Sequence, residues 1–590
     1  MTQLSHFFDY RVDAQGNRYM AVGIKGMTLL RFPPANKGTA FTLEERIELD
    51  LDGLLPPLVT TLDQQVERLY FSYQKQGSDI LKYQFLRAIQ DRSAVLFYAL
   101  LEKHLEEMIP IVYTPTIGLA VQQFSSLYRT ARGLTLSPQN IDRATTIMQR
   151  YPLLDVRMIV VTDASAILGI GDQGMGGLSI CIGKLALYTV GGGLSPFQSL
   201  PINLDVGTNR EELLDDPHYL GIRQRRLDKE AYFELVDKFV NAVRQVWPKA
   251  IIQWEDFTKD VAFDVLKRYQ NRLPCFNDDI QGTGAMVLAG LLAACARKQQ
   301  SLSDQKIIIV GAGAGGIGVA SIIRAGMLDA GLTAAEVRDR LFIIDMHGLV
   351  VEQSDLESYK LPFAQSADLF ADWHISGDSP NLLEAIHHLQ PNVLIGLSGC
   401  SGLFNEDVVS AMSRHHDQPI IFPLSNPNTH CEIHPQDLVN WSQAKAIMAF
   451  GSPFPDIDYQ GRKIPVRQGN NAFIFPGLGL AAVIGECHRI SDGMVLESAY
   501  ALADYIKQHV QDDGIYPPIA EIKQVSLYVA TRVLAKALGE GSAARHDLKN
   551  IQLSKYVEAN IWKAEYLPCR LSNEIGPAKA ETLSGEIPEI

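Results

Sequence analysis

The feature that most constrains the fold is a glycine-rich stretch near the middle of the chain. Ile307 to Val310 form a β-branched apolar run of the length expected for a buried parallel strand. Gly311, Gly313 and Gly316 follow in G-x-G-x-x-G spacing, and an apolar helical pattern continues from them. A second apolar run ends in Asp345. This order of strand, glycine turn, helix, strand and acid predicts a Rossmann-type dinucleotide site.

Each position of this site has an expected task. The first glycine allows the tight turn, the second lets the backbone approach the pyrophosphate, and the third lets helix and strand pack closely. The helix N-terminus faces the phosphates, and the terminal acid accepts hydrogen bonds from the ribose hydroxyls. The long spacing before Asp345 requires either an extra turn or a second helical piece, between Thr333 and Arg340. The predicted cofactor contacts here are Gly311, Ala312, Gly313, Gly316, Ile317 and Asp345.

A second G-x-G-x-x-G, from Gly169 to Gly174, is interpreted differently. The segment before it, from Val156 to Gly171, has the pattern of a hairpin, and no strand with a terminal acid follows at the Rossmann spacing. We therefore assign this motif to a substrate-side loop in which backbone approaches a ligand.

Size and charge narrow the class of protein. A chain of 590 residues is expected to form more than one domain. The formal net charge of −14 argues against a nucleic-acid-binding protein, which would present a basic face. Seven scattered cysteines indicate reduced thiols rather than disulfides. We see no signal peptide, and the longest apolar run is too short to span a bilayer, so a cytoplasmic protein that binds no membrane is expected.

The N-terminal third is predicted to be largely helical. Residues 1–35 have the pattern of paired strands or an arm, with a turn between Asp13 and Asn17. Thr42 has the sequence context of a helix N-cap, and apolar residues recur at helical spacing from Leu62 to Met108. A short apolar strand is then expected to end at Tyr113, in a position to face a cleft.

Acidic residues follow two predicted strands. Glu255 and Asp256 come after one apolar run, and Asp278 and Asp279 come after another. Three carboxylates drawn from these two segments, with no His or Cys pattern nearby, favour Mg²⁺ or Mn²⁺ over zinc. The alternative is that these acids only cap the helices that follow them.

Lys184 lies in a mostly apolar stretch. Burial would lower its pKa and make it usable as a general base, whereas the alternative is an ammonium that reaches the surface. Further along, two apolar runs near residues 391–396 and 419–424 are predicted parallel strands, and Asn426 follows the second. Asn470 and Asn471 lie in a turn before an apolar helix.

Several long motifs together resemble the malic enzyme family over nearly the whole chain, from Asn36 to about Leu538. They are Ile111-Val-Tyr-Thr-Pro-Thr-Ile-Gly118, Ile167-Leu-Gly-Ile-Gly-Asp-Gln-Gly174, Gly183-Lys-Leu185, Leu204-Asp-Val-Gly-Thr-Asn209, Trp254-Glu-Asp-Phe257, Phe276-Asn-Asp-Asp-Ile-Gln-Gly-Thr283 and Gly469-Asn-Asn471. The resemblance implies oxidative decarboxylation of L-malate to pyruvate and CO₂, with NAD or NADP and Mg²⁺ or Mn²⁺.

The resemblance also implies roles for individual residues. Lys184 would be the general base, Tyr113 would protonate the enolate carbon, and Asp278 would support the lysine. The metal ligands would be Glu255, Asp256 and Asp279. Asn426 and Asn471 would contact substrate or cofactor, and Asn470 would contact substrate.

One position departs from the family pattern. The family usually has an arginine that grips a substrate carboxylate within T-D-x-x-R-I-L-G, and Ala166 occupies that position here. Malolactic enzymes, which release lactate, also lack this arginine, so malolactic activity is the alternative. A second alternative is a non-catalytic NAD-binding sensor.

The nucleotide is expected to be NAD, since Asp345 would repel a 2′-phosphate. NADP stays open because Lys360 resembles a phosphate-binding lysine of NADP-using relatives.

The resemblance also implies a homodimer or homotetramer. The expected fold is α/β, with a Rossmann-type dinucleotide domain, an α/β substrate and metal domain, and a helical N-terminal region. The expected parts are 1–90 (arm and helices, a subunit interface), 91–278 (substrate and metal domain), 279–540 (dinucleotide domain, with about 468–538 packing back on the substrate domain) and 541–590 (tail).

Overall fold

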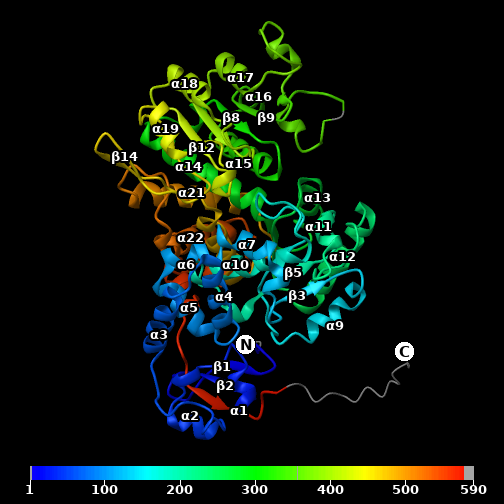
Figure 1. Ribbon diagram of the computed structural model, residues 1–590, viewed down its shortest axis with the longest axis vertical. Helices are drawn as coiled ribbons and strands as arrows, with labels where there is room; N and C mark the ends of the chain where they lie inside the picture. The colour runs from blue at the N-terminus through cyan, green and yellow to red at the C-terminus, as the bar shows by residue number, and fades with distance from the viewer. Residues whose placement is uncertain (1–2, 355, 577–590) are drawn as a thin grey trace.

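A computed structural model of the chain describes residues 3–354 and 356–576. Figure 1 shows an elongated molecule with a small sheet at one end, a middle part that contains helices and a second sheet, and the domain with the glycine-rich segment at the other end. The acidic segment from Glu581 to Ile590, predicted to be mobile, lies outside the described residues.

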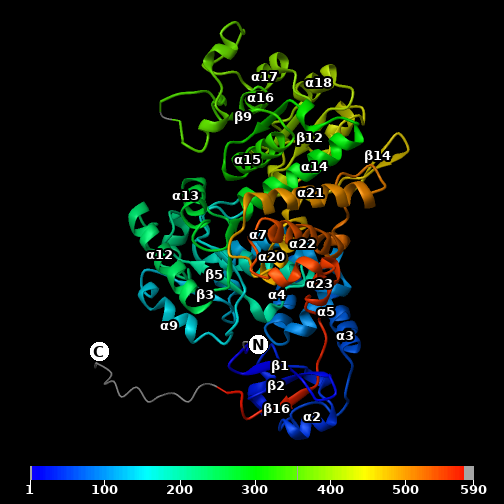
Figure 2. The same ribbon diagram turned by 180° about the vertical axis from the view of Figure 1, so that it is seen from behind.

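The small terminal sheet joins the two ends of the chain. Strand β1 (Phe8–Val12) pairs antiparallel with β2 (Arg18–Val22), and the Asp13 amide donates to the Asn17 carbonyl at 2.9 Å, which confirms the predicted turn. Strand β16 (Cys569–Leu571) lies parallel to β2 (Figure 2). For the tail the sequence predicts a few helical turns before its acidic end, and helix α23 (Leu553–Ala559) agrees with that. The tail also contains β16, which forms because it pairs with a strand more than 500 residues away.

The N-terminal helices confirm the predicted helical pattern. They are α2 (Leu43–Glu48), which begins with a capping box on Thr42, α3 (Leu62–Gln74), α4 (Asp79–Gln90) and α5 (Ala94–Lys103). The strand predicted to end at Tyr113 is wrong, because this segment is helix α6 (Leu105–Val112) with Pro110 inside it. Its last four residues are all apolar, so they show no alternation of apolar and polar residues at helical spacing.

Five parallel strands form the sheet of the middle domain. They are β3 (Leu134–Leu136), β5 (Ser199–Leu204), β4 (Met158–Thr162), β6 (Ile251–Trp254) and β7 (Cys275–Asn277), in that spatial order. The hairpin predicted for residues 156–171 is wrong, because β4 pairs in parallel with β5 and β6. The loop after it retains only an isolated bridge between Ile167 and Gly171. Long-range partners of this kind are invisible to a local pattern.

Helices connect and cover these strands. Those that position the site are α10 (Leu178–Val190), α12 (Lys229–Val246) and α13 (Lys259–Tyr269). Helix α10 is mostly apolar, with Lys184 as its one charged residue, and it is buried along its whole length. Such a helix must lie in the interior, and α10 packs against β4, β5 and α20 (Phe475–Ile484).

The dinucleotide domain contains a six-stranded sheet. Its spatial order is β10 (Gly348–Leu349), β9 (Leu341–Asp345), β8 (Ile307–Val310), β11 (Val393–Gly396), β12 (Ile420–Pro423) and β13 (Ile447–Met448), all parallel except β10. Helix α15 (Ala314–Asp329) follows β8, and α16 (Ala334–Arg338) is the extra helical piece that the spacing predicted. The strand order reverses beside β8, which is where a doubly wound sheet binds its ligand.

Long helices link the two sheets. Helix α14 (Thr283–Arg297) leads into the dinucleotide domain, while α21 (Asp492–His509) and α22 (Ile522–Gly539) lie between the domains in both views (Figures 1 and 2). Among the described residues, the stretch Asp278–Arg297 is the one helix long and apolar enough to cross a membrane, and 78% of it is buried inside the protein. That burial is typical of the core helix of a globular domain.

Candidate active site

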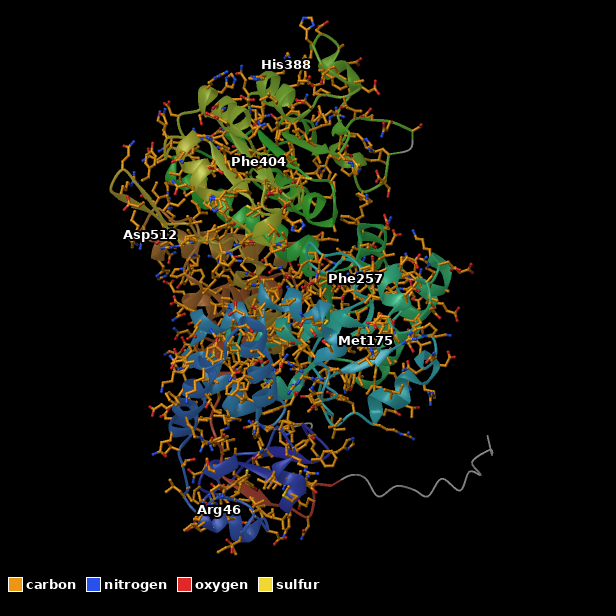
Figure 3. All side chains as sticks on the ribbon, viewed as in Figure 1. Arg46, Met175, Phe257, His388, Phe404 and Asp512 are labelled. Carbon is orange, nitrogen blue, oxygen red and sulfur yellow. The ribbon has the colours of Figure 1, made fainter. Side chains whose placement is uncertain are left out.

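A cavity of about 280 Å³ lies between the two sheets, and both domains line it. The middle domain contributes the ends of α6, β6 and β7 and the loop after β4. The dinucleotide domain contributes the glycine turn and the loops after β11 and β12. Phe257, which lines this cavity, lies at the side of the middle domain nearest the dinucleotide domain (Figure 3). The cavity is lined by Tyr113, Thr114, Ala166, Leu168, Glu255, Asp256, Phe257, Asp279, Thr283, Met286, Ala314, Gly315, Leu397, Leu424, Asn426, Gly451, Gly469, Asn470 and Asn471.

Three carboxylates meet at one edge of the five-stranded sheet. Strands β6 and β7 are paired so that Trp254 lies opposite Asn277, and the acids after each strand therefore become neighbours. One carboxylate oxygen from each of Glu255, Asp256 and Asp279 lies within 4.8 Å of the other two. The Asp256 amide also donates to Asp279 Oδ2 at 2.8 Å, which fixes the two acids against each other.

These acids fit a hard divalent cation. Asp256 Oδ2 is buried and has no hydrogen-bond partner in the described structure. No protein group therefore replaces the hydrogen bonds to water that this oxygen loses on burial. Burial, with the Asp279 and Glu255 charges, raises the pKa of Asp256 well above its usual range. Burial likewise raises the pKa of Asp279 to about 8, and the neighbouring Glu255 adds to the effect. An all-oxygen donor set of this charge fits Mg²⁺ or Mn²⁺.

Lys184 is at the centre of a buried ionic cluster. Its Nζ lies 2.7 Å from Glu255 Oε1 and 2.7 Å from Asp278 Oδ2, and its side chain is 0% exposed. The alternative of an ammonium that reaches the surface is therefore wrong. The predicted lowering of its pKa is also wrong. Burial alone would lower the pKa, but the charges of Asp278 and Glu255 outweigh it and raise the pKa above the usual range.

Asp278 connects the lysine to the dinucleotide side. Its Oδ2 accepts from Lys184 and also from Asn471 Nδ2 at 2.6 Å. Burial raises the pKa of Asp278 to about 7, with Glu255 adding and Lys184 opposing. The predicted proximity of Asp278 to Lys184 is confirmed. At neutral pH this carboxyl is able either to hold or to release a proton.

Tyr113 covers the lysine from the cavity side. It follows the last residue of α6, and its ring centre lies 5.2 Å from Lys184 Nζ. Gly183 makes this approach possible, because a Cβ there would lie 2.7 Å from the Val112 carbonyl oxygen. Burial raises the pKa of the Tyr113 phenol, so the phenol stays protonated. The Phe475 ring, which no sequence pattern singles out, lies 4.5 Å from the same Nζ.

The glycine turn has the predicted geometry. Gly311 has a φ of +116°, a conformation that favours glycine. A Cβ on Gly316 would lie 1.8 Å from the Gly311 carbonyl oxygen, so only glycine allows the helix to start so close to the strand. Asp345 ends β9 as expected, and its Oδ2 accepts from Lys360 Nζ at 2.9 Å.

The three predicted asparagines differ in their surroundings. Asn426 lines the cavity from the loop after β12, and Asn471 binds Asp278. Asn470 also lines the cavity, but its side chain accepts from the Ala472 amide and so caps the next turn.

Glu432, which the sequence analysis missed, organises the loop that carries Asn426. It is fully buried, its Oε1 accepts from the amide and hydroxyl of Ser398 and from the Ser425 hydroxyl, and its Oε2 accepts from the Ser425 amide. The role of Glu432 is visible only from its burial in the folded structure, because nothing in the local sequence indicates it.

The loop that carries the second G-x-G-x-x-G lies next to the cavity, and its predicted approach to a substrate stays a prediction. A Cβ on Gly169 would lie 2.6 Å from the Asn426 carbonyl oxygen, so this loop meets the opposite domain closely. Ala166 and Leu168, just before the motif, line the cavity.

The fold and this cavity define a dinucleotide-dependent oxidoreductase with a cluster of three carboxylates in its cavity. The family model described as "Malic enzyme, N-terminal domain" matches residues 90–270, and "Malic enzyme, NAD binding domain" matches residues 280–538. The chain belongs to the malic enzyme family.

Curated relatives agree over almost the full length. The chain is 44% identical over 554 residues to the NAD-dependent malic enzyme of Idiomarina loihiensis, covering 94% of this chain and 98% of the relative. It is 44% identical over 544 residues to that of Pseudomonas aeruginosa, covering 92% and 96%. The malic enzyme structure from Entamoeba histolytica has the same fold, with a TM-score of 0.54, 21% identity, and coverage of 87% of this chain and 90% of that one.

Proposed function

We propose that this enzyme oxidises and decarboxylates L-malate to pyruvate and CO₂ with NAD as the electron acceptor and Mg²⁺ or Mn²⁺ as the metal. The observation that carries the proposal is one cavity that the acidic cluster and the glycine turn both line, with the Lys184–Asp278 pair directly behind its wall. The names of the relatives at 44% identity support the substrate and the nucleotide.

Glu255, Asp256 and Asp279 would hold the metal. When bound, NAD supplies the hydride acceptor, and the divalent cation supplies Lewis-acid polarisation of substrate oxygens. The carbonyl groups and amides on the opposite wall, including Asn426, would orient the substrate toward the nicotinamide.

Lys184 and Asp278 would handle the hydroxyl proton. Because the carboxylates keep Lys184 protonated, it becomes a base only after its own proton moves to Asp278 Oδ2, 2.7 Å away. A pKa of about 7 allows Asp278 to accept that proton at neutral pH. Neutral Lys184 then takes the C2 hydroxyl proton as the substrate is oxidised.

Tyr113 would supply the second proton. Its phenol stays protonated, lines the cavity and lies over Lys184. After CO₂ leaves, the phenol protonates the enolate carbon, and Lys184 returns the proton to the phenolate. The lysine and tyrosine thus act in sequence on neighbouring substrate atoms.

The nucleotide site favours NAD. Asp345 ends β9, where the acid of a dinucleotide fold meets the ribose hydroxyls, and Lys360 is already held by Asp345 at 2.9 Å and Glu357 at 3.0 Å. A lysine neutralised by two carboxylates is a poor partner for a 2′-phosphate. We therefore place NADP second.

The test follows absorbance at 340 nm with L-malate, Mn²⁺ and either NAD or NADP, and identifies the organic acid by chromatography. Reduced nicotinamide accumulating with pyruvate, faster with NAD, is expected. Lactate without net reduced cofactor would establish malolactic activity instead. NAD binding without turnover of malate would establish a sensor.

We further propose a homodimer or homotetramer in which residues 1–90 form a subunit interface, ahead of a substrate and metal domain (91–278) and a dinucleotide domain (279–540). We also propose a cytoplasmic location, supported by the seven cysteines, all of them free thiols in the described part of the chain. Light scattering of the full chain and of a variant with charged substitutions on its exposed N-terminal surface tests the assembly.

A further inference from the structure

The active-site cavity has acidic, amide and apolar walls. Among the described residues that line it, none is Lys, Arg or His. Lys184, the nearest cation that the mechanism uses, lies behind the wall and is engaged by two carboxylates at 2.7 Å each. Whatever part of a substrate extends away from the metal cluster therefore meets no positive side chain.

Ala166, where the family usually has an arginine, is held in place by hydrogen bonds of its loop. The Ala166 amide donates to the Asp256 carbonyl oxygen at 3.0 Å, and the Leu168 amide donates to Asp256 Oδ1 at 3.3 Å. Both hydrogen bonds tie this loop to a proposed metal ligand, so residue 166 borders the place where the substrate must lie. Arg226 offers no substitute, since Asp172 binds its guanidinium at 2.6 Å and it does not line the cavity.

This wall is suited to an uncharged group. Ala166 and Leu168 on one side, and Leu397, Leu424 and Met286 on the other, present apolar surface to the cavity. A second carboxylate on the substrate would lose water there and gain no charge-assisted hydrogen bond to a cation. The amides of the cavity can bind a neutral carboxamide or hydroxyl group as well as a carboxylate.

We propose that the enzyme has a further activity, the NAD-dependent oxidation of 2-hydroxy acids whose C4 group carries no charge, and that Ala166 determines this breadth. The inference rests on the proposed function, because it uses the same base and cofactor. The C2–H bond breaks with its electron pair passing to NAD⁺, which becomes NADH, and the hydroxyl proton passes to neutral Lys184. The product is the 2-oxo acid, with no loss of CO₂ where C4 is not a carboxylate.

The test compares L-malate with its C4 monoamide, which has nearly the same shape but no charge at C4. Turnover of both is followed at 340 nm with NAD and Mn²⁺, and the product of the amide is identified by mass spectrometry. We expect kcat/KM values within about tenfold of each other, since no cation distinguishes them, whereas a site that grips the carboxylate by an arginine discriminates by about 100-fold or more.

Binding provides a readout separate from turnover. Calorimetric titration of the Mg²⁺-loaded protein without nucleotide is expected to give dissociation constants for malate and the amide within about tenfold. The Ala166→Arg variant should raise the preference for malate at least tenfold in both binding and kcat/KM. Ala166→Leu, which adds bulk without charge, is the matched control and should leave the preference unchanged.

The outcomes separate this inference from the function it rests on. Malate turnover with the amide more than 100-fold poorer would overturn the inference and leave the proposed function intact. Oxidation of the amide without turnover of malate would overturn the proposed function and support the inference. Inactivity toward both substrates would overturn both.

Discussion

Metal binding at the acidic cluster is expected to release protons. Burial raises the pKa of Asp279 to about 8, and burial also raises the pKa of Asp256 above its usual range. A carboxyl whose pKa lies above the solution pH holds a proton that a cation must displace. At pH 7 Asp279 should therefore yield about one proton per metal ion bound, and the raised pKa of Asp256 acts in the same direction.

The direction in which metal affinity changes with pH follows from this release of protons. Because protons compete with the metal, the affinity should rise with pH, by about tenfold per pH unit for each proton released. The rise should flatten as the pH passes the pKa of Asp279, near 8. At a free Mn²⁺ concentration one hundred times the dissociation constant, the bound ion should stabilise the folded protein by about 2.7 kcal/mol.

Titration calorimetry measures the proton count directly. Mn²⁺ is titrated at pH 7 in two buffers of different ionisation enthalpy, and the difference in observed heat gives the number of protons released. Asp279→Asn, which keeps the shape of the side chain, should lower the count by about one. Asp513→Asn, at an exposed carboxylate paired with Arg462 far from the cluster in sequence, is the control and should leave it unchanged. Equal heats in both buffers would refute the reasoning.

Three other changes test the rest of the site. Lys184→Met should lower kcat by about 100- to 10,000-fold while NAD binding, measured by fluorescence, is retained; unimpaired turnover would exclude the lysine as the base. Lys360→Gln should leave kcat/KM for NAD nearly unchanged, and a large loss confined to NADP would mean that NADP is the physiological nucleotide. Gly316→Ala should weaken NAD binding at least tenfold, because its Cβ would lie 1.8 Å from a backbone oxygen, whereas Gly315→Ala meets nothing closer than 4.0 Å and should bind normally.

The sequence predicted those parts of the site that depend on local order. The glycine turn, Asp345 at the end of β9 and the acids after β6 and β7 all follow a strand directly, and adjacent parallel strands bring their ends together. Lys184 was recognised from its apolar surroundings, but its two carboxylate partners come from other segments, so the direction of its pKa shift was predicted wrongly.

The errors share a physical origin. Helix α6 was taken for a strand because its all-apolar end shows no periodicity. Strand β4 was placed in a hairpin because its true neighbours lie 41 and 93 residues away in the sequence. Glu432 and Phe475 support the site only through tertiary contacts. Such contacts leave no mark on the residues next to them in the chain.

The pairing of β16 with β2 sets the order in which this protein is completed. The Cys569 amide also donates to Glu45 at 2.7 Å, and Glu45 binds Lys37 at 2.6 Å, so the C-terminal strand joins a buried ion pair formed by the first fifty residues. The ribosome makes the N-terminal strands first, but they wait for nearly the entire chain before their sheet is complete. A nascent chain therefore exposes the open edge of β2 until residues 569–571 have been made, and pairing with β16 then closes that edge.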